Sequence, residues 1–92
     1  MGNGPGCPLG KRIEVELVEA DVEIGFSLVD LAGQEFQSGH TSVAARVLHD
    51  ADDVLEDIEQ RLSRLNNGDR ESFGPLVAEL RREVTDAKSR GA

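Results

Sequence analysis

The sequence has no Trp, no Tyr and only three Phe among its 92 residues. Aromatic side chains stack on unpaired bases and line many small-molecule pockets, so this composition disfavours both kinds of site. The single cysteine, Cys7, cannot form an internal disulfide. No apolar run approaches the roughly 18 residues of a membrane span. No basic segment followed by an apolar one marks a secretory signal, and we therefore expect a cytoplasmic protein.

Basic residues are also scarce, with ten Lys and Arg against 18 Asp and Glu, which gives a formal net charge of −8. Acidic surfaces repel phosphate backbones and anionic lipids, so we expect neither nucleic acid nor a membrane surface as a partner. Hydrophobic residues make up 38% of the chain, and most of them are Leu, Val and Ala, which suit packing between helices. A chain of this length buries only about 60% of its unfolded surface, so its stability is small unless it oligomerises.

Residues 41–65 carry the clearest pattern in the chain. Their apolar side chains recur at steps of three and four and fill an arc of about 140° at about 100° per residue. The apolar positions are Ala44, Val47, Leu48, Ala51, Val54, Leu55, Ile58, Leu62 and Leu65. Charged and polar residues fill the rest of the circumference. The pattern predicts an amphipathic helix whose apolar face must be covered.

Residues 11–38 allow two interpretations. Apolar and polar residues alternate over 13–17 and 20–28, as they would in a hairpin of two strands. A polar stripe nevertheless keeps helical spacing throughout, at Glu16, Glu19, Glu23, Ser27, Asp30, Gln34 and Gln37. The segment also has no Asn-Gly or Asp-Gly pair to turn a hairpin. We favour a helix, although its β-branched residues and Gly25 lower the helix propensity.

The predicted fold is therefore an all-α three-helix bundle. An antiparallel helical hairpin is formed by residues 11–38 and 41–65, with Gly39 ending its first helix and Thr41 or Ser42 capping its second. A third helix runs over residues 73–88, with Ser72 as its cap and Pro75 in its first turn. Residues 1–10 form a flexible tail rich in Gly and Pro, and residues 11–92 form one helical domain.

The first predicted helix is apolar over more than about 200° of its circumference, so one neighbour cannot cover it. One apolar flank, with Leu17, Ala20, Ile24, Leu28 and Leu31, can meet the face of 44–65. The other flank needs another helix or another chain. We therefore predict that Val15, Val18, Val22 and Val29 form an interface that stays partly open in a monomer.

Residues 28–51 resemble one tetratricopeptide helix pair. The matching positions are Leu28, Leu31, Ala32, Gly39, Ala44, Leu48 and Ala51. The chain departs from the family at Glu35, where a Tyr is preferred, and at Glu56, where a Pro ends the repeat. One unit is visible, about a quarter of the chain, whereas such repeats need at least about three to stabilise one another. The resemblance implies a protein-interaction role.

Candidate catalytic and metal-binding groups are few. His49 and Asp53 lie one helical turn apart, near Asp52 and Glu56, and could hold a divalent ion at low affinity. We interpret this group as a solvated acidic face, because it lies opposite the apolar positions. Glu16, Glu19 and Glu23 are interpreted as an exposed stripe, and His40 as a turn residue. The sequence thus predicts no catalytic, cofactor-binding or metal-binding residues, and we expect no cofactor and no tight metal binding.

Two classes of function remain. The first is a small helical protein–protein interaction or oligomerisation module, which binds another protein or a second copy of itself; we expect a homo-oligomer. The alternative is a helical-bundle enzyme or metal-binding protein whose site forms between the chains of a dimer. The first is favoured because no convergent polar groups occupy the predicted buried faces.

Overall fold

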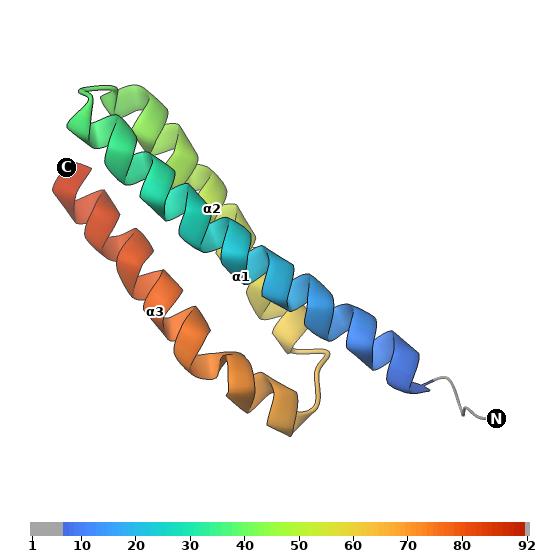
Figure 1. The fold of residues 1–92 in the computed structure, drawn as a ribbon. Coiled ribbons are helices and arrows are strands. Elements are labelled where there is room, and N and C mark those ends of the chain that lie inside the picture. Colours follow the sequence, from blue (N-terminus) through green and yellow to red (C-terminus); the bar gives the residue numbers. More distant parts are fainter. Residues whose placement is uncertain (1–6, 92) are drawn as a thin grey trace.

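Three helices form the described part of the protein, residues 7–91 of a computed structural model, with side chains described for residues 13–90. They are α1 (Cys7–Gln37), α2 (Thr41–Leu62) and α3 (Asn67–Gly91). The chain runs up, down and up again, so that the end of α3 lies near the turn between α1 and α2 (Figure 1). The all-α fold and the helical hairpin are confirmed. Residues 13–28 belong to one helix, and the strand hairpin is excluded there.

The first helix begins at Cys7, four residues before the predicted start at 11. Part of the segment expected to be a flexible tail is therefore helical, and residues 1–6 lie outside the described residues. Pro8 stands at the second position of α1, where a proline is tolerated because the N–H groups of the first turn have no partner within the helix.

Gly39 ends the first helix as the sequence predicts, with a positive φ of 85°. Its N–H donates to Phe36 O at 3.1 Å, and the N–H of His40 donates to Glu35 O at 2.8 Å. These two hydrogen bonds form the Schellman motif, in which a residue without a Cβ is preferred at the left-handed position. The predicted cap at Thr41 or Ser42 is wrong: Thr41 begins α2, and the capping position belongs to His40, which makes no side-chain cap.

The second helix ends at Leu62, three residues before the predicted end at 65. Its last turn tightens, since the N–H groups of Arg64 and Leu65 donate to carbonyls only three residues back. Leu65 remains buried after the helix has ended. Its side chain therefore packs into the core from the connection between α2 and α3.

The third helix begins at Asn67, not near 73, so the predicted cap at Ser72 is wrong. Asn66 caps it: its side-chain Oδ1 accepts a hydrogen bond from the N–H of Asp69 at 2.8 Å. The guanidinium of Arg70 donates to Leu62 O at 3.2 Å and Leu65 O at 3.1 Å, which ties this early turn to the end of α2. Pro75 consequently lies inside the helix and not in its first turn.

The core runs along the axis of an elongated bundle of 57 × 18 × 15 Å. Near the turn between α1 and α2, three alanines without exposed surface, Ala32, Ala44 and Ala51, allow the two helices to pack closely. The remaining core positions are dominated by Val, Leu, Ile and Phe from all three helices. The fully buried large side chains are Val18, Ile58 and Leu80.

The predicted exposure of the valine flank of α1 is wrong for Val18 and Val22, whereas Val15 and Val29 remain partly exposed. Val18 and Val22 are only 0% and 5% exposed and belong to the core, while Val15 and Val29 are partly buried against it. The reason is the packing of α3 along this flank, since Phe73, Val77, Leu80 and Val84 of α3 share one core cluster with Val18 and Val22. All four lie within the predicted third helix of residues 73–88, so the helix was predicted but the face of α1 that it covers was not.

Candidate functional site

The exposed apolar surface of α1 lies on the flank that the sequence had assigned to the interior. Ile13 and Ile24 are 50% and 49% exposed, and Leu17 and Leu31 are each 40% exposed. Together with the exposed Ala20, these residues share an arc of about 60° at about 100° per residue. We call Ile13, Leu17, Ala20, Ile24 and Leu31 the outer stripe. Its length, at about 1.5 Å per residue, is about 27 Å.

The spacing of the outer stripe is that of a helix–helix contact. Its residues follow one another at steps of four, three, four and seven, the pattern that places apolar side chains along one seam between two helices. α1 therefore carries apolar residues on two faces, one turned to α2 and α3 and the other turned to solvent. The spacing of the outer stripe can be seen in the sequence. The valine face of α1 has an equally regular period, however, and no local sequence feature shows which of the two faces is buried.

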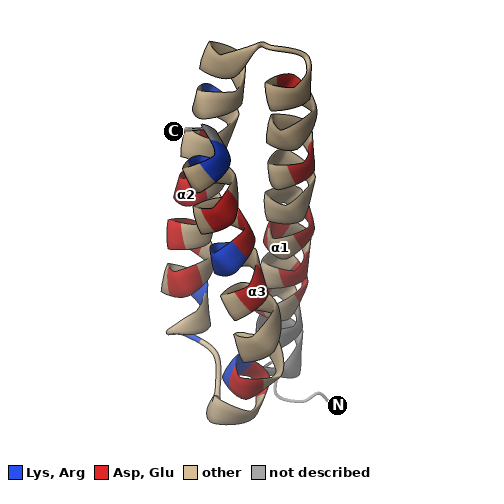
Figure 2. Ribbon diagram, turned by 90° about the vertical axis from the view of Figure 1, so that its left-hand side faces the viewer, with Lys and Arg blue, Asp and Glu red and all other residues tan. Residues whose placement is uncertain are grey.

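Only acidic charge occurs on α1 between residues 13 and 37. The segment contains no Lys, Arg or His and seven acidic residues, namely Glu14, Glu16, Glu19, Asp21, Glu23, Asp30 and Glu35. Figure 2 shows the acidic residues along the described part of α1, whereas α2 and α3 carry both signs of charge. Every charged residue that α1 itself places beside the outer stripe between residues 13 and 37 is therefore acidic.

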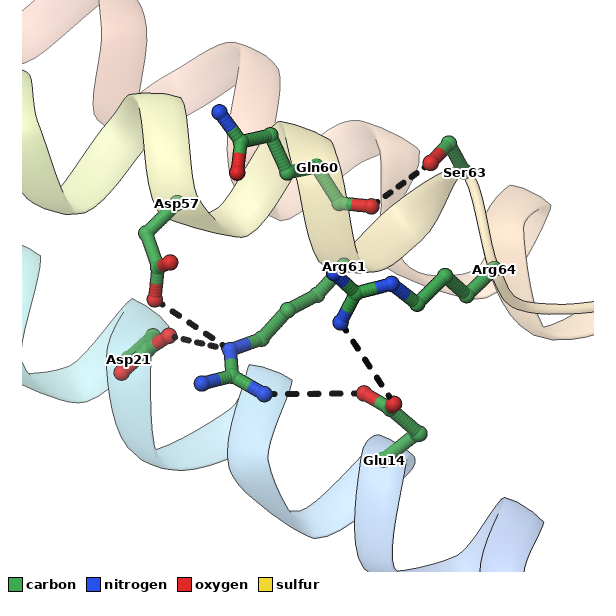
Figure 3. Close-up of polar contacts among 7 residues, drawn as sticks. All are labelled: Glu14, Asp21, Asp57, Gln60, Arg61, Ser63 and Arg64. Carbon is green, nitrogen blue, oxygen red and sulfur yellow. Dashed lines mark hydrogen bonds and ion pairs between the residues drawn. The ribbon is translucent and has the colours of Figure 1, made fainter.

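The acidic residues on the α2 side of α1 have partners within the protein. Arg61 of α2 lies between them: its Nε donates to Asp57 Oδ2 at 3.2 Å and lies 3.3 Å from Asp21 Oδ2, and its Nη1 lies 3.6 Å from Glu14 Oε1 (Figure 3). Arg64 approaches the same carboxylate of Glu14 at 3.7 Å. These contacts join the N-terminal half of α1 to the C-terminal half of α2.

The carboxylates around Arg61 do not share one environment. Burial raises the pKa of Asp21, with the neighbouring Asp57 as a further cause. The pKa of Asp57 is lowered because its carboxylate is stabilised first by the protonated carboxyl of Asp21, as a hydrogen-bond donor, and then by Arg61. Asp21 Oδ2 is buried and accepts no hydrogen bond, although Arg61 is close. Glu14 Oε1 is likewise buried without a hydrogen bond. The cluster is therefore a structural ion-pair network with two poorly satisfied members, Glu14 and Asp21.

The acidic residues on the opposite edge of the outer stripe have no such partners among the side chains that the structure describes. Among the side chains of residues 13–90, no Lys, Arg or His lies within ion-pair distance of Glu16, Glu19, Glu23 or Asp30. All four are exposed. The sequence prediction that Glu16, Glu19 and Glu23 form an exposed stripe is confirmed, and this stripe borders apolar residues rather than a uniformly polar surface.

The residues around His49 lie on the surface of the bundle and do not enclose a site. His49, Asp53 and Glu56 are exposed, and Asp52 forms an ion pair with Lys88 of α3. His40 at the turn pairs through Nδ1 with Glu35 Oε1 at 2.7 Å. Within the described residues, no cluster of three or more His, Cys, Asp or Glu has the geometry to hold a metal ion. The structure does not bring His49 and His40 into one site.

The described surface includes depressions between the helices. One of about 250 Å³ lies between α2 and the ends of α1 and α3; apolar side chains such as Phe36 and Leu48 line it, with His49 and the Asp52–Lys88 pair at its rim. A wider groove of about 700 Å³ runs between α1 and α3. Among residues 13–90, no polar or charged residue is buried as a whole. The buried side-chain oxygens without a hydrogen-bond partner belong to Glu14 and Asp21, which line neither depression.

Comparison with models of protein families, with curated proteins and with solved structures yields no match to this chain. The described helices include none that is long and apolar enough to cross a membrane.

Proposed function

We propose that the protein is a small helical interaction module that binds another protein chain through the outer stripe of α1. The observation that carries this proposal is the exposure of four large apolar side chains along one line, each between 40% and 50% exposed. A soluble domain rarely leaves a continuous apolar strip open to water unless a partner covers it. The interaction role implied by the tetratricopeptide-like positions accords with this proposal.

Photo-crosslinking from the stripe tests the proposal directly. We would place p-benzoylphenylalanine at position 24 of the full chain, and, in a matched control, at position 76, because Leu76 of α3 is also exposed, at 46%. Illumination in an extract of the cells that produce the protein should give a discrete adduct from position 24 and none from position 76. The mass of the adduct distinguishes a second copy of this chain from another protein.

Sedimentation equilibrium of the purified protein provides the complementary measurement. Self-association that Ile24→Ser abolishes and Leu76→Ser does not would assign the stripe to oligomerisation. A protein that stays monomeric and gives no adduct from position 24 contradicts the proposal, because the stripe would then have no occupant.

A further inference from the structure

We infer that the occupant of the outer stripe is an amphipathic helix of another protein whose apolar face is flanked by Lys and Arg. This inference rests on the proposed function and adds the chemistry of the partner. It depends on the charges beside the stripe and on which of them already have partners within the chain.

The length and spacing of the stripe select a helix as the partner element. The five residues span about 27 Å along α1, which corresponds to about 18 residues of a partner helix at about 1.5 Å per residue. The steps of three and four match the knobs that a second helix presents from its own apolar face. A helix laid along α1 would bury Ile13, Leu17, Ile24 and Leu31 together.

The acidic residues beside the stripe indicate which charge the partner helix carries next to its apolar face. Glu16, Glu23 and Asp30 lie next to the stripe on its far edge from α2 and are unpaired among the described side chains. By contrast, Glu14 and Asp21 on the near edge are occupied by Arg61. A partner with basic residues beside its apolar face would place cations opposite Glu16, Glu23 and Asp30.

The same charges disfavour a second copy of the chain. Between residues 13 and 37 α1 carries only acidic charge, and its two basic residues, Lys11 and Arg12, precede the stripe. Two α1 helices that met along their outer stripes would therefore place acidic residues opposite acidic residues along most of their length. Like charges at such flanking positions oppose association and select against that partner. The apolar stripe therefore favours contact with a helix, and the acidic residues beside it disfavour a second copy of this chain.

Designed peptides separate these contributions. The first probe is a labelled peptide of about 21 residues with Leu at the a and d positions and Lys at the e and g positions. The second probe carries Glu in place of Lys, and the third has the composition of the first with its Leu residues scrambled. Binding of each to the full-length protein is measured by fluorescence anisotropy at low and at high salt.

We expect the Lys-flanked peptide to bind, and binding to weaken as salt rises. Ile24→Ser or Leu17→Ser should each weaken binding by about tenfold or more, since each removes a large apolar contact. Leu76→Ser should leave binding unchanged. The triple variant Glu16→Gln, Glu23→Gln and Asp30→Asn should weaken binding at low salt and reduce its salt dependence. Circular dichroism of each variant checks that the fold is retained.

The remaining outcomes overturn the inference in distinguishable ways. Equal binding of the Glu-flanked peptide would keep the interaction module and remove the basic partner. Equal binding of the scrambled peptide would show attraction by charge alone. Self-association through the stripe, with no peptide bound, would make a second copy the occupant and leave the proposed function standing. If no peptide binds, no self-association occurs and position 24 gives no adduct, both proposals are wrong.

Discussion

Gly25 of α1 lies directly against the side chain of Leu80 of α3. A Cβ at position 25 would be 2.6 Å from Leu80 Cδ2 and 3.3 Å from Cδ1, and Leu80 has no exposed surface into which it could move. The glycine lowers the helix propensity of α1 by about 1 kcal/mol. Its absence of a side chain is what lets α3 approach the face of α1 that carries Val18 and Val22.

Gly25→Ala should therefore destabilise the protein, although alanine is the better helix former. We expect the overpacking against Leu80 to cost about 1–3 kcal/mol, which exceeds the gain in propensity. Gly33→Ala is the matched control, because a Cβ there meets nothing within 4 Å. It should stabilise the protein by about 0.5–1 kcal/mol. Urea denaturation measures both, and a stabilising Gly25→Ala would show that α1 and α3 are not closely packed at this point.

The core of α2 provides a second prediction. Ala51→Glu or Ile58→Asp should unfold the domain, because each puts a charge without a partner at a position with no exposed surface. The cost is several kcal/mol, against a total stability of about 5–15 kcal/mol for a typical domain. Asp53→Ala changes only an exposed position of the same helix and should leave the melting temperature nearly unchanged. Similar melting temperatures for all three variants would mean that the faces of α2 are reversed.

Two substitutions in the N-terminal part of α3 should have opposite effects on the stability of the protein. Asn66→Ala removes the side-chain cap on Asp69 and should cost about 1 kcal/mol. Pro75 is exposed inside the helix, where it cannot donate the N–H that the helix requires. Pro75→Ala should stabilise the protein by up to about 3 kcal/mol. Denaturation by guanidinium tests both; if Pro75→Ala has no effect, residues 67–74 do not form one helix with the rest of α3.

The carboxylates around Arg61 predict a pH dependence. The pKa of Asp21 in the folded protein is raised above its ordinary value of 3.8, so the folded state binds this proton more tightly than the unfolded state. Ionised Asp21 therefore destabilises the fold at neutral pH, and this penalty disappears as the pH falls through the raised pKa. Asp21→Asn should raise the melting temperature at pH 7 and give no advantage below the ordinary pKa.

Asp57 serves as the opposing control, because its pKa is lowered by the hydrogen bonds that it accepts. Its ionised form stabilises the fold above its ordinary pKa of 3.8, and that contribution is lost as the pH falls through the lowered value. Asp57→Asn should therefore lower the melting temperature at pH 7. Thermal melts from pH 2 to pH 8 compare the two variants. Effects of the same sign at pH 7 would contradict this assignment.

The helices themselves were determined by the sequence, because their signals are local. The steps of three and four over residues 41–65 describe a helix whatever packs on it, and the polar stripe from Glu16 to Gln37 outweighs the alternation that suggested strands. Gly39 was equally predictable, since a left-handed residue at a helix end favours glycine. These features gave the all-α hairpin before any tertiary contact was known.

The tertiary structure decided which face of α1 is buried and where α3 begins. α1 is apolar on two faces of similar regularity, and packing against α2 and α3, including the close approach of Leu80 to Gly25, turns the Val18 and Val22 face inward. α3 starts at Asn67, where Asn66 caps it and Arg70 binds carbonyls at the end of α2. The Arg70 contact joins two elements, so helix propensity does not contain it. Local periodicity determines that a helix forms, whereas long-range packing determines which of its faces remains for a partner.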